Sequence, residues 1–123
     1  MNQIIWIALG GALGAVLRYL TISGIAQLIP YEFPFGTLMV NILGCFILGA
    51  IFASYSGTPQ FQESIRPFFI IGILGGFTTF STYSMELVHL VKNQESIKAL
   101  TYFFLSNLLG FAAAFLGLKW FSA

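Results

Sequence analysis

The sequence predicts an all-α membrane protein with four transmembrane helices, the third of them broken near the bilayer midplane. Three observations support this prediction. Hydrophobic residues make up 58% of the 123 residues and charged residues only 7%, against roughly 25% charged residues in soluble domains. Four apolar stretches are each long enough to cross the bilayer, which takes about 20 helical residues. One of these stretches contains glycine, serine and threonine in a pattern that disfavours a continuous helix.

The composition also excludes several classes of protein. Five basic and four acidic side chains are too few to cover the surface of a soluble domain of 13.5 kDa. A net charge of +1 offers no basic surface for the phosphates of a nucleic acid. The single cysteine, Cys45, allows no internal disulfide. We therefore expect one membrane domain spanning residues 1–123, without a signal peptide because no basic residue precedes the first apolar stretch.

The first two predicted spans cover residues 4–29 and 35–55. Pro30 and Pro34 bracket the segment between them, which leaves room only for a tight antiparallel return. An amide in hydrocarbon needs a partner, so Asn41 of the second span either joins two helices or offers its N–H groups to an anion.

The first span contains one charged residue, Arg18, on the same helical face as Gly10 and Gly14. Glycines four residues apart permit the close approach of another helix. An arginine inside a span is costly and faces a partner or a cavity. Arg18 is therefore either a structural residue bonded to carbonyls at a helix end or a residue that attracts anions.

The third predicted span, residues 67–91, carries the strongest local signal. Pro67 suits its first turn. Residues 72–84 read GILGGFTTFSTYS, in which paired glycines precede five Ser/Thr residues. A helix break at membrane depth leaves backbone groups that only protein, water or a bound ion can satisfy. Several transporters build ion sites from such half-helices, so the pattern favours an ion site over a simple packing kink.

Polar and aromatic side chains follow this predicted break. Phe80 and Tyr83 share a helical face, and Ser81 and Thr82 offer hydrogen-bond donors. The edge of an aromatic ring is electropositive, so it can contact an anion without holding it tightly. Glu86 is the only acid within the predicted spans, and it is either a residue of a pore mouth or an interfacial carboxylate.

The fourth predicted span, residues 97–121, carries Tyr102, Ser106 and Gly110 at intervals of four. This spacing places them on one helical face. We expect that face to lie against protein rather than lipid.

The short loops do not fix the orientation of the chain. Arg66 and Lys119 lie on one side of the predicted membrane, and Lys92 and Lys98 lie on the other. Because an excess of Lys and Arg marks the cytoplasmic side, this balance indicates either weak topology signals or insertion in both orientations.

Three segments carry a resemblance that extends over essentially the whole chain. They read GGALGAVLRY at residues 10–19, GTLMVNILG at 36–44 and GGFTTFST at 75–82. These segments resemble the helix patterns of the Fluc family of fluoride channels, also called CrcB proteins. The resemblance implies a dual-topology antiparallel homodimer in the cell membrane, which exports fluoride passively through two pores.

The resemblance also implies roles for individual residues. The fluoride pore would be lined by Asn41, Phe80, Ser81, Thr82, Tyr83, Tyr102 and Ser106. Arg18 and Glu86 would lie at its vestibule. The backbone carbonyls of Gly75 and Thr78 would hold a structural sodium ion, Na+, at the dimer centre, and oxygen ligands suit such a hard cation.

The chain departs from the family pattern at two positions. Tyr83 stands where many members have Phe, and its hydroxyl can hydrogen-bond an ion. Gly110 stands where some members carry a further hydroxyl.

Other functions fit the sequence less well. A small dual-topology drug/proton exchanger, the main alternative, needs a titratable carboxylate deep in the bundle, whereas Glu86 lies near a helix end. A non-transporting scaffold protein would explain the glycines but not the interrupted third span. An enzyme is disfavoured because the sequence offers no nucleophile–base pair or metal-ligand cluster.

Overall fold

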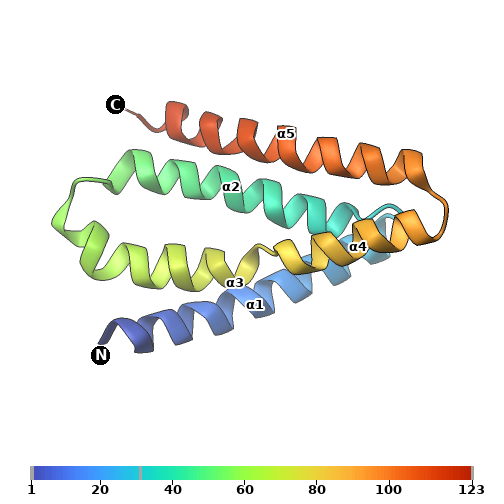
Figure 1. Ribbon diagram of the computed structural model, residues 1–123. Coiled ribbons are helices and arrows are strands. Elements are labelled where there is room, and N and C mark those ends of the chain that lie inside the picture. Colours follow the sequence, from blue (N-terminus) through green and yellow to red (C-terminus); the bar gives the residue numbers. More distant parts are fainter. Residues whose placement is uncertain (1, 31, 123) are drawn as a thin grey trace.

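The computed structural model describes residues 2–30 and 32–122, which form a bundle of helices that run up and down its long axis (Figure 1). The elements in chain order are α1 (Asn2–Leu28), α2 (Phe35–Tyr55), η1 (Phe61–Leu74), α3 (Gly75–Phe77), α4 (Phe80–Lys92) and α5 (Ser96–Trp120). Within these described residues, four helical segments are long and apolar enough to cross a membrane, if η1, α3 and α4 count as one. The predicted four-span fold is confirmed.

The structure has four membrane-spanning rods: α1, α2, the run of η1, α3 and α4, and α5. The first and third of these rods approach closely because glycines line their contact. A β-carbon added at Gly10 would collide with the carbonyl of Phe68, and one added at Gly14 would collide with the carbonyl of Ile73. Both glycines are buried. The close helix approach predicted from their spacing is therefore confirmed, and its partners are η1 and α3.

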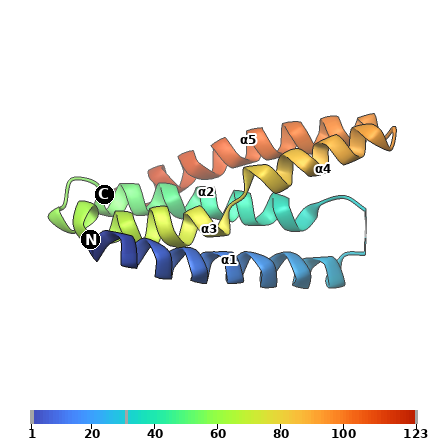
Figure 2. The ribbon, with the colours of Figure 1, turned by 60° about the horizontal axis from the view of Figure 1, so that its bottom comes forward.

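The second and fourth rods form a matching pair. A β-carbon at Gly49 of α2 would meet the carbonyl of Ala114, and one at Gly117 of α5 would meet the carbonyl of Phe46. Small residues that let backbones approach in this way are a common basis of helix packing in membranes. The bundle thus consists of two tightly packed pairs, α1 with η1 and α3, and α2 with α5 (Figure 2).

The third rod begins earlier than predicted. We expected Pro67 in the first turn of a span over residues 67–91, but η1 already begins at Phe61 and Pro67 lies inside it. Proline cannot donate a backbone hydrogen bond, and its ring crowds the carbonyl one turn earlier. The segment is wound as a π-helix, in which the amide of Gly75 reaches the carbonyl of Ile70.

The predicted break in the third rod is confirmed. α3 ends at Phe77, and Thr78 and Thr79 adopt extended backbone with ψ of 157° and 123°. α4 then begins at Phe80 and turns toward α5, whereas η1 and α3 lie along α1 (Figure 2). A small hydrophobic core of α2, α4 and α5 residues lies beyond the break: Leu38, Tyr83, Leu90, Ala99 and Tyr102.

Candidate functional site

Asn41 bridges the broken third rod to α2. Its amide nitrogen donates to the carbonyl of Thr79 over 3.0 Å, and its amide oxygen accepts from the backbone N–H of Thr79 over 2.8 Å. The Asn41 side chain thereby replaces backbone hydrogen bonds that a continuous helix would supply. Of its two N–H groups, the one not used for Thr79 remains for another acceptor.

At the break, two backbone N–H groups bond side chains instead of the carbonyls that they would bond in a continuous helix. In an unbroken helix the amide of Thr79 would bond the carbonyl of Gly75, and the amide of Thr82 would bond that of Thr78. Instead, the Thr79 amide donates to Asn41, and the Thr82 amide donates to the Thr79 hydroxyl over 3.2 Å. The carbonyls of Gly75 and Thr78 have therefore lost their helical partners.

A groove of about 330 Å³ runs beside the break and is open on its outer side. Its lining includes Asn41, Gly75, Thr78, Thr79 and Phe80. The asparagine and one of the two aromatic residues expected to line the pore therefore lie together with both expected sodium ligands.

The first turn of α4 presents its side chains in different directions. Phe80 is 78% exposed in the single chain, and Ser81 and Thr82 are also exposed, whereas Tyr83 is only 7% exposed. The rings of Phe80 and Tyr83 lie 5.7 Å apart between centroids, as expected from their shared helical face. The Ser81 hydroxyl lies 3.4 Å from that of Thr79.

The stripe on α5 faces protein, as predicted. Tyr102 and Gly110 are buried, and the Oγ atom of Ser106 is buried with no hydrogen-bond partner among the described residues. The ring of Tyr102 packs edge-on against Tyr83, with centroids 5.1 Å apart. Tyr102, one of the two α5 residues predicted to line the pore, therefore packs against the second aromatic of α4.

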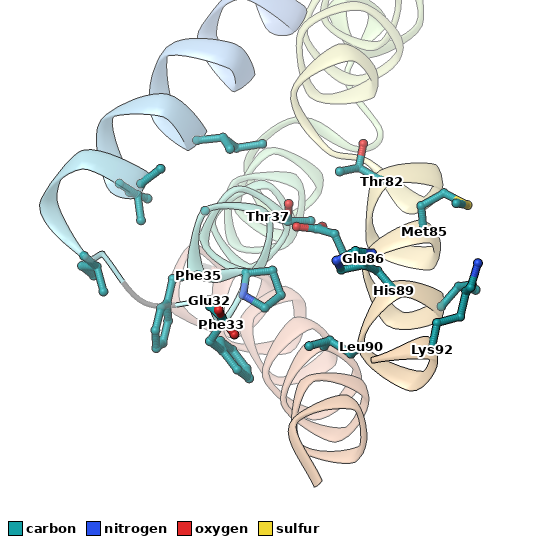
Figure 3. A pocket seen from close by; sticks show the side chains of 17 residues that line it. Glu32, Phe33, Phe35, Thr37, Thr82, Met85, Glu86, His89, Leu90 and Lys92 are labelled. Carbon is teal, nitrogen blue, oxygen red and sulfur yellow. The ribbon is translucent and has the colours of Figure 1, made fainter. Parts of the chain in front are cut away.

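Glu86 lines a cavity of about 620 Å³ between the end of α1, the start of α2 and α4. It accepts a hydrogen bond from the hydroxyl of Tyr102 over 3.2 Å. From α4 it reaches toward Thr37 at the start of α2, and Thr82 and His89 flank it (Figure 3). Glu86 therefore faces a partly open cavity that the chain's own helices form.

Arg18 lies apart from these groups. It is half-exposed on α1 and lines neither the cavity beside Glu86 nor the groove beside Gly75. The single chain therefore does not bring the two expected vestibule residues together.

Comparison with known proteins places the chain in a family. Residues 5–118 match the model of a family described as CrcB-like protein, Camphor Resistance (CrcB). This chain belongs to the CrcB-like family. The resemblance identified from the three sequence segments is thus confirmed.

This chain is similar to several known proteins over most of its length. It is 43% identical to a fluoride-specific ion channel FluC of Magnetococcus marinus, and the match covers 94% of each chain. It is 46% identical to a FluC of Shewanella halifaxensis over 80% of this chain and 79% of the relative. It is 39% identical to a FluC of Helicobacter pylori strain G27 over 97% of this chain and 91% of the relative.

Three polar residues lie at the site although none of them was predicted to line it. Thr79 caps α4 and pairs with Asn41, a role signalled by the preference for threonine at helix N-caps. Thr37 lies one turn before Asn41, and its hydroxyl is buried without a hydrogen bond in the described part of the chain. Asn107 contacts Tyr83, which nothing in the local sequence indicates.

Proposed function

We propose that this chain forms a fluoride-selective ion channel of the cell membrane, through which fluoride leaves the cell passively. The observation that carries the proposal is the similarity, over 94% of each chain, to a relative named as a fluoride-specific ion channel. The geometry supports it, because the broken rod exposes polar atoms in the middle of a segment that is long and apolar enough to span a membrane. Passive conduction needs no catalytic residues, so in this proposal the chain is a channel and not an enzyme.

The pore has to compensate for the water that fluoride loses. Fluoride is small and strongly hydrated, so a selective pore needs several donors, each weak enough to release the ion. In this proposal the pore is lined by Asn41, Phe80, Ser81, Thr82, Tyr83, Tyr102 and Ser106. The second N–H of Asn41 and the hydroxyl of Ser106 have no acceptor among the residues that the structure describes, and they are the donors of this proposal. The edges of Phe80 and Tyr83 add weaker electropositive contacts.

The cavity beside Glu86 serves as the vestibule in this proposal. Thr37 and Thr82 line it together with Glu86, so it offers hydroxyl groups next to the pore residues of α4 and α5. Arg18 does not line this cavity, so in this proposal its positive charge attracts anions to the protein from a separate position on α1.

We infer that the channel is an antiparallel homodimer with dual topology and two pores. Phe80, proposed as a pore residue, is 78% exposed in the single chain. The groove that it lines is open on its outer side, so a second copy would have to enclose the pathway. The balance of basic residues in the loops favours neither orientation, which permits copies to insert both ways.

A structural sodium ion between the copies fits the carbonyls of Gly75 and Thr78. Both have lost their helical donors, and both residues line the open groove. Hard cations prefer oxygen ligands and take more than two of them. One chain therefore supplies an incomplete set, and two copies together supply twice as many. Bound there, the ion would supply positive charge that stabilises the unpaired carbonyls.

The direct test is ion efflux from liposomes that contain the purified protein. We expect fluoride to leave rapidly down its gradient, without a proton gradient, while chloride is retained. No fluoride efflux, or chloride efflux at a similar rate, would refute the proposed function. Empty liposomes loaded with the same salts report the leak.

A further inference from the structure

Asn107 of α5 holds the hydroxyl group of Tyr83. Its Nδ2 atom lies 3.2 Å from Tyr83 Oη and 2.9 Å from the backbone carbonyl oxygen of Phe103. A carbonyl oxygen only accepts hydrogen bonds, so the Asn107 atom facing it is the nitrogen rather than the oxygen of the amide. The same nitrogen faces Tyr83, and Asn107 is therefore the donor in that contact.

The direction of this bond leaves the Tyr83 hydroxyl with its own hydrogen to donate. Its oxygen accepts from Asn107, and no acceptor for its O–H occurs among residues 2–30 and 32–122. Tyr83 is only 7% exposed. A buried donor without an acceptor is costly, and such groups are usually satisfied by a ligand or by water.

The ring of Tyr83 lies among residues of the proposed pathway. The Tyr83 ring contacts the rings of Phe80 and Tyr102, with centroids 5.7 Å and 5.1 Å away. Ser106 precedes Asn107 in the chain, and its buried hydroxyl also has no partner in the described part of the molecule. A second hydroxyl without a partner therefore lies on the α5 turn that holds Asn107.

We propose that Tyr83 donates its O–H to the translocated anion, in addition to its ring edge, and that Asn107 is its positioning residue. This inference rests on the proposed function and names a further ion contact within that pore. Hydrogen bonds to a charged acceptor are about twice as strong as neutral ones, so a small anion such as fluoride gains from this donor. Phenylalanine at this position would offer the ring edge alone.

The experiment measures initial fluoride efflux from liposomes at increasing internal fluoride, for the wild type and for Tyr83→Phe, Asn107→Leu and the double variant. Tyr83→Phe is expected to raise the half-saturating fluoride concentration about tenfold, because one hydrogen bond to a charged group is lost. Asn107→Leu should raise it less. In the Tyr83→Phe background, Asn107→Leu should add no further change, because Asn107 acts through the hydroxyl.

The controls separate this inference from folding and from the proposed function. Tyr19→Phe removes a hydroxyl from a residue that is 70% exposed. It should leave both the maximal efflux rate and the half-saturating fluoride concentration unchanged. Asn107→Ala replaces Asn107→Leu if the latter elutes as aggregate.

Three outcomes overturn the inference. If Tyr83→Phe conducts as fast as the wild type with an unchanged half-saturating fluoride concentration, the donor role of Tyr83 is refuted while the proposed function stands. An equal effect of Asn107→Leu in both backgrounds refutes the positioning role. Absence of flux in the wild type refutes the proposed function and this inference together.

Discussion

Asn41 is the residue on which the geometry of the break depends. Its side chain pairs with both the N–H and the C=O of Thr79, in the middle of a segment that is long and apolar enough to span a membrane. Threonine residues complete the arrangement, because the hydroxyl of Thr79 caps α4 and that of Thr78 bonds back to the carbonyl of Leu74 over 2.8 Å. A single amide and two hydroxyls therefore make an interrupted backbone tolerable in the bilayer.

Asn41→Ala should destabilise the protein as well as reduce flux. The substitution leaves the N–H and C=O of Thr79 without partners, at a cost of about 1–3 kcal/mol for each buried group. The midpoint of thermal unfolding in detergent should fall clearly. Asn93→Ala is the matched control, because within the described chain the Asn93 side chain bonds only the exposed side chain of His89, so its loss should change little. Equal midpoints for Asn41→Ala and the wild type would contradict this account.

Phe80→Ile should reduce fluoride flux while the protein still folds and assembles. The side chain is 78% exposed in the single chain, so its loss removes little core packing. An aromatic edge contact is worth about 1 kcal/mol, which corresponds to about fivefold in flux. Phe111→Ile, at a residue 74% exposed on α5, is the control and should conduct normally. Normal efflux from Phe80→Ile liposomes would remove the ring edge from the proposed mechanism.

At the scale of elements, glycines determine how closely the helices pack. Gly14 lets α1 reach the backbone of the third rod, where any side chain would collide with the carbonyl of Ile73. Gly24 of the same helix has open space around its missing side chain in the single chain. The two positions therefore separate the packing role of glycine from its poor helix propensity.

Gly14→Ala should destabilise the bundle, whereas Gly24→Ala should be neutral or stabilising by up to about 1 kcal/mol through better helix propensity. The collision at Gly14 involves backbone and cannot be relieved by a side-chain rotation. Thermal unfolding of both variants in the same detergent measures the difference. If the two variants unfold at the same temperature, close packing of α1 against η1 and α3 is not what Gly14 provides.

The helical elements could be predicted from the sequence because composition and length determine them in a bilayer. The span at residues 35–55 agrees with α2, Phe35–Tyr55, and the break was predicted from the glycines and threonines that disfavour a helix. The start of the third rod could not be predicted in this way. A proline is typical of a first helical turn, but here Pro67 lies within a π-helix that begins at Phe61.

The candidate site was only partly predictable for a related reason. Asn41 and the Ser/Thr run stand out because polar residues in a span need partners. Which partner each of them takes depends on helix packing, so the pairing of Asn41 with Thr79 and of Asn107 with Tyr83 appeared only in three dimensions. The roles of single residues in binding fluoride or sodium stay predictions.

At the scale of the whole molecule, the proposed antiparallel dimer requires insertion in both orientations, which the balance of basic residues permits. Two reporters are fused to the C-terminus in separate proteins, one active only inside the cell and the other active only outside the membrane. Both fusion proteins should be active. Lys119 lies in the last turn of α5. Adding several lysines after it should shift the population to one orientation. Fluoride flux should then fall, because an antiparallel dimer needs copies in both orientations. A wild-type reporter confined to one side would contradict dual topology.

Removal of sodium should weaken the assembled channel. If the carbonyls of Gly75 and Thr78 hold Na+ between two copies, replacing sodium with a large organic cation removes a charge that binds them together. We expect a lower thermal midpoint of the dimer and slower fluoride efflux, both restored by adding sodium back. Potassium at the same ionic strength is the control for general salt effects. Unchanged stability in sodium-free buffer would argue against a structural ion.

The central claim is that the assembled protein conducts fluoride passively and selectively. Electrical recording in a planar bilayer, with fluoride on one side and chloride on the other and no proton gradient, tests it most directly. We predict a steady current whose reversal potential follows the fluoride gradient and ignores the chloride gradient. The absence of current, or a reversal potential that follows chloride or protons, would contradict the account.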